Sequence, residues 1–263
     1  MEFIKDIFKN KSLILRLGKN DFKNRFAGTS LGAIWGFVQP FIFMMTYVIV
    51  FQYILKSASP GEYPFIVWYL PGMAMWQFIS DSISSVSSSI RSYSYLVKKV
   101  VFPVNIIPII TLTSSSIIAM FLFTICIIVG AVLGYMVNIL MLVYVIFAAY
   151  CFIISFTRLT SAICALISDF GQLLSVIMQL GFWLTPIMWN ISMLEGNSIA
   201  LNAIKCSPFA YLVTAFREAF VGGTLVTEKN FLFTGIFWGI VLLFFIWGNS
   251  VFKRSRKDFA DVI

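Results

Sequence analysis

Six runs of apolar residues, each long enough to cross a lipid bilayer, limit what this chain can fold into. A helix rises about 1.5 Å per residue, so about 20 apolar residues span the hydrocarbon core. Backbone polar groups inside a bilayer must be satisfied within the helix, and a β-barrel would show short alternating segments instead. The sequence therefore predicts an all-α polytopic membrane protein with six transmembrane helices, at Leu31–Leu55, Phe65–Ser85, Val104–Leu133, Ile139–Ile163, Gly171–Trp189 and Phe231–Phe252.

The composition excludes other classes of protein. Hydrophobic residues make up 60% of the chain and charged residues only 11%, whereas a soluble domain carries roughly 25% charged residues. A soluble enzyme, a disordered protein and a disulfide-rich miniprotein are therefore ruled out. Histidine is absent and the four cysteines have no close metal-ligand spacing, so no metal site is expected.

Lysine and arginine residues gather on one side of the predicted spans. Fifteen of them lie before span one, between spans two and three, near the end of span four and in the tail, against four on the other side. The positive-inside rule predicts that both termini are cytoplasmic, in a multi-pass protein of the bacterial cytoplasmic membrane. This topology also accounts for the net charge of +8, so no nucleic-acid partner is predicted.

Two segments of this single domain, residues 1–263, do not span. Residues 1–28 are expected to form a cytoplasmic interface helix, because Met1–Leu17 alternates apolar and charged residues at close to helical periodicity. Residues 190–230 are predicted to form short re-entrant helices on the outer side, at Ile199–Ile204 and Phe209–Val221; a soluble outer loop is the less favoured alternative. Residues 253–263 form a cytoplasmic tail.

No motif for catalysis is present. The chain lacks a phosphate-binding GxxxxGK[ST] loop, an HExxH motif and a GxSxG motif, so no catalytic residue is assigned and the chain is not expected to hydrolyse ATP itself. Asp81 lies in predicted span two and Asp169 beside predicted span five, and both lie near cytoplasmic span ends. Carriers driven by protons or sodium usually place acids or histidines at mid-depth, so this pattern disfavours secondary transport.

Four segments in order resemble a known family: Asp21–Pro40, Leu96–Pro103 with Pro108, Phe182–Trp189 and Ser207–Glu218. Together with six spans and this length, they resemble the membrane subunit of type-2 ABC exporters for polysaccharides and polyol phosphates, such as O-antigen, capsule and teichoic-acid exporters. The resemblance covers nearly the whole chain. One departure is Ser92-Tyr-Ser-Tyr95, in a turn where the family often has asparagine.

The resemblance implies a permease that forms a homodimer and joins two copies of a separate ABC ATPase. ATP and magnesium would be bound by that ATPase, and this chain would hold no cofactor. The substrate would be a polymer linked to undecaprenyl diphosphate or a similar lipid, passing through a channel between the protomers. The interface helix and the loop between spans two and three would rest on the ATPase.

The predicted ATPase-coupling segment is the polar stretch between spans two and three. Proline closes this stretch and stiffens it, which suits a lever on the cytoplasmic face; an ordinary positively charged loop is the alternative. The assigned coupling residues are Arg91, Tyr95, Leu96, Lys98, Lys99, Phe102 and Pro103.

Aromatic residues are the candidates for the substrate channel. Phe43, Tyr47 and Phe51 repeat every four residues on one helix face, and Phe182 and Trp183 are added from span five. Sugar rings stack on aromatic rings in contacts that tolerate sliding, but a lipid-facing row would look the same in sequence.

Two basic residues are candidates for a lipid headgroup. Arg25 and Lys23 precede span one and could bind a lipid pyrophosphate; positive-inside anchoring is the alternative.

Small residues leave two further alternatives open. Nine serines between Ser80 and Ser94 could hydrate the mouth of a cavity or permit close helix packing. Gly28, Gly32 and Gly36 repeat every four residues and predict a small helix face for close packing.

Three other functions compete with the polysaccharide exporter. The first is an ABC permease for a drug or a lipid. The second is an isoprenoid-linked membrane transferase, which normally needs an acidic metal-binding pair that this chain lacks. The third is a structural or channel protein, which would need no lever.

Overall fold

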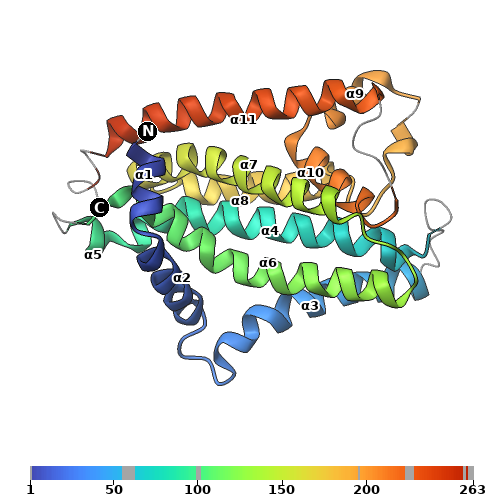
Figure 1. The fold of residues 1–263 in the computed structure, drawn as a ribbon, viewed down its shortest axis with the longest axis horizontal. Helices are drawn as coiled ribbons and strands as arrows, with labels where there is room; N and C mark the ends of the chain where they lie inside the picture. The colour runs from blue at the N-terminus through green and yellow to red at the C-terminus, as the bar shows by residue number, and fades with distance from the viewer. Residues whose placement is uncertain are drawn as a thin grey trace.

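The chain folds into an elongated bundle of helices. The computed structural model describes residues 2–54, 63–98, 102–194, 196–222, 228–256 and 259. Within these residues the regular structure is helical and contains no strand. The long helices α4, α6, α7 and α11 run along the bundle axis (Figure 1). The predicted all-α class is confirmed.

Four helical segments are long and apolar enough to cross a membrane. The first is Gly32–Ile54, built from η1 (Gly32–Ile34), α3 (Trp35–Val48) and the π-helical turn η2 (Ile49–Ile54). The second is Val104–Val132, built from η3 (Val104–Ile106) and α6 (Ile107–Val132). The others are α7 (Ile139–Leu166) and Phe231–Ser255 of α11 (Glu228–Ser255). They match predicted spans one, three, four and six.

The two remaining predicted spans have a different character. Helix α4 (Phe65–Ser92) has 28 residues, but its serine-rich second half makes it less apolar than the four segments above. It is the most buried long helix and lies against α6, α7 and α10, so most of its surface faces protein. Helix α8 (Phe170–Leu184) is apolar but has only 15 residues, and ends before the predicted Trp189.

Two short helices lie at the opposite end of the bundle from α1 (Figure 1). Helices α9 (Ser198–Lys205) and α10 (Pro208–Glu218) are bent by 79° where they meet. They correspond closely to the short helices predicted at Ile199–Ile204 and Phe209–Val221.

The N-terminal segment forms two helices, α1 (Glu2–Lys9) and α2 (Lys11–Arg25), which run across the end of the bundle (Figure 1). The segment predicted as one interface helix, residues 1–28, is therefore two helices, because the chain breaks near Asn10 and the second helix ends at Arg25. Helix α2 lies so close to α6 that a Cβ on Gly18 would be 2.8 Å from the Thr113 side chain.

The predicted helix face Gly28, Gly32 and Gly36 does not form. Gly28 and Gly32 have φ values of +90° and +54°, in the left-handed region that favours glycine. These two glycines shape the connection between α2 and α3, whereas Gly36 lies in α3 against the Phe26 ring.

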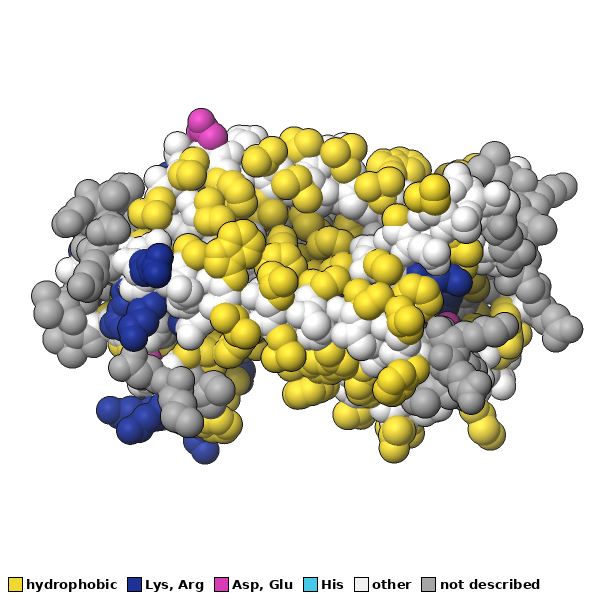
Figure 2. Space-filling view, turned by 90° about the horizontal axis from the view of Figure 1, so that it is seen from above, with side chains coloured by type: hydrophobic (Ala, Val, Ile, Leu, Met, Phe, Trp, Pro, Cys, Tyr) yellow, Lys and Arg dark blue, Asp and Glu magenta, His cyan; other side chains and the backbone are white. Residues whose placement is uncertain are grey.

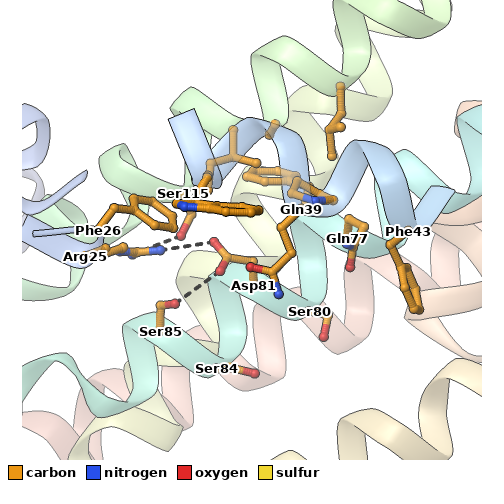
Figure 3. A pocket seen from close by; sticks show the side chains of 17 residues that line it. Arg25, Phe26, Gln39, Phe43, Gln77, Ser80, Asp81, Ser84, Ser85 and Ser115 are labelled. Carbon is orange, nitrogen blue, oxygen red and sulfur yellow. Dashed lines mark hydrogen bonds and ion pairs between the residues drawn. The ribbon is translucent and has the colours of Figure 1, made fainter. Parts of the chain in front are cut away.

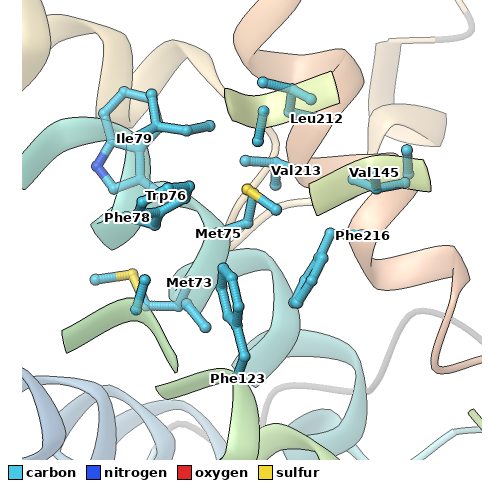
Figure 4. Close-up of a cluster of buried hydrophobic side chains, with 14 of the residues drawn as sticks. Met73, Met75, Trp76, Phe78, Ile79, Phe123, Val145, Leu212, Val213 and Phe216 are labelled. Atoms are coloured by element: carbon cyan, nitrogen blue, oxygen red, sulfur yellow. The ribbon is translucent and has the colours of Figure 1, made fainter. Parts of the chain in front are cut away.

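Side chains from four helices interlock to form the core (Figure 4). Large apolar residues of α4, including Met73, Met75 and Trp76, pack with Phe123 of α6 and Phe216 of α10. Buried apolar residues of α7 complete the cluster. This core holds α4 rigidly, and α4 in turn supplies one wall of the candidate site.

Arg158, which the sequence analysis counted among the basic residues near the end of span four, is a buried cation. Its side chain is 4% exposed and its guanidinium lies 3.9 Å and 4.4 Å from the ring centroids of Phe3 and Phe252. It donates a hydrogen bond of 3.0 Å to Asn249 Oδ1. Arg158 thus ties α1, α7 and α11 together.

Candidate functional site

A pocket of about 620 Å³ opens between the connection from α2 to α3 and the helices α4 and α6 (Figure 3). Amides and hydroxyls line one part of it, from Gln39 of α3 and from Gln77 and Ser80 of α4. Aromatic rings, including those of Trp35 and Phe43, line another part. Amides and hydroxyls beside flat rings suit a ligand that is polar, uncharged and ring-shaped.

Arg25 lies in this pocket with its charge already paired. Its guanidinium contacts Asp21 at 3.2 Å and Asp81 at 3.3 Å (Figure 3 shows the pair with Asp81). It also donates hydrogen bonds to the Thr111 carbonyl at 3.3 Å and to Ser115 Oγ at 3.2 Å. Two carboxylates surround one cation, so the pocket offers no excess positive charge to an anion. Arg25 instead joins α2 to α4 and α6.

The sequence prediction missed this ion pair. Asp81 was noted only as an acid near the end of a span, and Gln39 and Gln77 were not singled out. The available signal was that Arg25 and Asp81 carry opposite charges near the same membrane surface. Lys23 is separated from Arg25 by one residue, and its side chain is exposed.

The serine-rich part of α4 performs both roles that the sequence left open. Ser80, Ser84 and Ser85 line the pocket. Ser87 is buried and forms a 2.6 Å hydrogen bond with Thr160 of α7. One face of the helix therefore hydrates a cavity while another permits close packing.

The structure brings together all five aromatic residues predicted for the channel. The Phe43 and Tyr47 rings are 4.9 Å apart, and the Tyr47 and Phe51 rings 6.4 Å apart. Tyr47 is also 6.4 Å from Phe182 of α8, whose ring is 5.4 Å from that of Trp183. Because Phe43 also lines the pocket, this aromatic row runs continuously from the pocket along α3 to α8.

The predicted coupling residues in the described part of the chain divide into half-buried and exposed side chains. Arg91 donates hydrogen bonds of 2.6 Å and 3.2 Å to the carbonyls of Cys164 and Ala165. These bonds supply donors to two backbone carbonyls in the last turn of α7. Tyr95 of α5 (Ser94–Val97) and the following Lys98 are exposed. Leu96, Phe102 and Pro103 are half-buried, and Lys99 lies outside the described residues.

The coupling segment is joined to the N-terminal helices. Tyr93 donates a hydrogen bond from its hydroxyl to Asp21 of α2. Burial, reinforced by this hydrogen bond, raises the pKa of Tyr93 above its ordinary value, so the hydroxyl remains a donor at neutral pH. Asn105 of η3 donates a 2.8 Å hydrogen bond to Asp6 of α1. A movement of α1 and α2 would therefore be transmitted to α4 and α6.

Arg217 is a second buried cation that sequence reasoning treated as an outer-side charge. It is 6% exposed and lies 3.7 Å from the Trp68 ring centroid. It donates hydrogen bonds to the carbonyls of Trp68, Pro186 and Ile187 at 2.8, 2.9 and 3.1 Å. It thereby links α10 to α4 and to the segment after α8.

A helical bundle with four apolar helices of membrane-spanning length defines a multi-pass membrane protein. The chain belongs to the ABC-2 type transporter membrane family, whose model matches residues 12–221. It is therefore a transport subunit, and the resemblance found in the sequence is confirmed.

Curated relatives match the chain over nearly its whole length. The O-antigen export system permease protein RfbA of Myxococcus xanthus is 22% identical over 100% of both chains. A protein of the same name from Klebsiella pneumoniae is 25% identical over 95% of each chain.

Proposed function

We propose that this chain is the permease subunit of an ABC exporter that moves an O-antigen-like, lipid-linked polysaccharide across the bacterial cytoplasmic membrane. The observation that carries the proposal is the end-to-end similarity to O-antigen export permeases from two organisms. The aromatic row and the polar pocket, in which the charge of Arg25 is paired with Asp81, suit sugar rings.

The proposed assembly is a homodimer joined by two copies of a separate ATPase that binds ATP and magnesium. Helices α1, α2 and α5 and the C-terminal end of α11 all lie at one end of the bundle (Figure 1). Lysine and arginine side chains gather at that end, while hydrophobic side chains cover most of the middle (Figure 2). The positive-inside rule places such an end in the cytoplasm, where Tyr95 and Lys98 are exposed for contact with the ATPase.

The proposed topology keeps six spans. Helix α4 is the second span, since its 28 residues are long enough and its polar face is covered by other helices. Helix α8 and the segment to Trp189 form the fifth. The 79° bend between α9 and α10 supports a re-entrant pair on the outer side.

The proposed polymer path follows the aromatic row from the pocket to α8. A sliding polymer needs many weak and equivalent contacts, because a single tight site would stall it. Stacking on flat rings supplies such contacts. Phe43 is 44% exposed and Trp183 is 63% exposed, so both rings have surface available for a substrate between two protomers.

The test replaces Phe43, Tyr47 and Phe51 together with leucine and measures surface polymer against the membrane level of the complex. Leucine keeps the apolar contact and removes the flat ring. We expect nearly complete loss of export from the triple variant and a mild loss from each single change. The control variant replaces Phe147 and Trp247, which are exposed aromatic residues of α7 and α11, with leucine. This variant should export normally.

Full export by the triple variant would remove the aromatic row from the polymer path. Normal surface polymer in cells that lack this chain would overturn the polysaccharide function and favour a drug or lipid permease.

A further inference from the structure

A second, basic groove lies outside the polar pocket. It has a volume of about 360 Å³ and runs between α2 and α6. Arg16, Lys19 and Lys23 line it from α2, and Ile117 lines it from α6. The three cations are spaced by three and four residues, which places them on the same face of the helix. The groove borders the contact between the two helices, because Phe22 of the buried face of α2 also lines it.

The charge in this groove is free. Arg16, Lys19 and Lys23 are exposed, and none of them forms an ion pair within the described part of the chain. No carboxylate lines the groove among the described residues. Arg25 differs from these three residues, because its guanidinium is directed inward and paired with two carboxylates. Of the two basic residues predicted to meet a lipid headgroup, the structure leaves only Lys23 with an unpaired charge.

An apolar strip continues from the groove along α6. Met120, Ile127 and Ile128 are exposed and lie on the same face of the helix as Ile117. A ligand that fits both parts has a strongly anionic head and a long apolar tail. Three cations suit a headgroup with several negative charges better than the single charge of a common anionic phospholipid.

We propose that the groove formed by Arg16, Lys19 and Lys23 binds the diphosphate headgroup of a polyisoprenoid lipid, with the tail lying along α6. This rests on the proposed function, because such a lipid is the carrier of the proposed substrate. The groove then holds the charged carrier at the membrane surface, while the pocket in which Arg25 is paired with Asp81 is left for the sugars.

The test measures binding of farnesyl diphosphate to the purified full-length chain in nanodiscs of zwitterionic phosphatidylcholine. The groove variant replaces Arg16, Lys19 and Lys23 with glutamine. The matched control replaces Lys5, Lys9 and Lys11 with glutamine; these are exposed residues of the same N-terminal helices that do not line the groove. Both variants lose three positive charges. A difference in binding between them therefore reports the groove itself and not the overall charge of the protein.

We expect the groove variant to bind about tenfold more weakly or worse, and the control to change by less than about threefold. Farnesol should not bind, and phosphatidylglycerol added to the discs should not displace the diphosphate. The three changed residues lie on the exposed face of α2, so the unfolding temperature should be unchanged.

Equal losses in both variants, or no loss in the groove variant, would overturn the site. Displacement by phosphatidylglycerol at an equal mole fraction would show general attraction to anionic lipids and would also overturn it. The proposed function is tested separately, by the amount of surface polymer in cells. A negative result for the groove would therefore leave the proposed function unaffected.

Discussion

Replacing Gly72 with alanine should destabilise the protein, although alanine normally favours a helix. A Cβ at this position of α4 would lie 2.5 Å from Nη2 of Arg217. Ordinary contact begins at 3.4 Å, so Nη2 must retreat by about 0.9 Å. That movement breaks or stretches its hydrogen bonds to the Pro186 and Ile187 carbonyls, now 2.9 and 3.1 Å long.

The magnitude follows from two opposing terms. Alanine is favoured over glycine in a helix interior by about 1 kcal/mol. Each hydrogen bond to a charged group contributes about 1.5–3 kcal/mol, and both carbonyls bonded to Nη2 are affected. Arg217 is 6% exposed, so bulk solvent cannot readily replace these partners. The net loss of unfolding free energy should be about 2–5 kcal/mol.

The assay is equilibrium unfolding in mixed micelles, with Gly239→Ala as the matched control. Gly239 also lies in a long helix, but nothing occupies the space within 4 Å of its Cβ position, so this variant should keep or gain stability. In an Arg217→Met background the clash is absent, and Gly72→Ala should then be neutral or stabilising. Equal stability of Gly72→Ala and wild type, or an undiminished loss in the Arg217→Met background, would refute the reasoning.

Two further predictions concern topology and coupling. A membrane-impermeant thiol reagent on intact cells should label Cys206, which is half-buried beside α9, and Cys206→Ser should abolish labelling; Cys126 is buried in α6 and should not react. Labelling that persists in Cys206→Ser would contradict the topology. Lys98→Glu should leave the fold intact, because this side chain is exposed, yet should uncouple ATP hydrolysis by the partner from export. Normal export by Lys98→Glu would exclude it from the coupling surface.

The apolar pattern was sufficient to predict four of the membrane helices. Spans one, three, four and six were located to within a few residues, because a span facing lipid must be apolar over about 20 residues whatever it packs against. The break between α9 and α10 was also predictable, since Pro208 begins a new helix. The motifs indicated the family for a similar reason, because they are local runs of residues that require no knowledge of the fold.

Only the tertiary structure decided the roles of the charged residues. Arg25, Arg158 and Arg217 look in the sequence like basic residues outside the spans or near their ends, yet all three are turned inward. Several of their partners are distant in the sequence: Asp81 is 56 residues from Arg25, and the Trp68 carbonyl is 149 residues from Arg217. Side-chain periodicity reports which face of a helix is apolar, but not which distant group comes to lie beside it. A buried cation is stable only when such partners converge on it, and their convergence depends on how the helices pack.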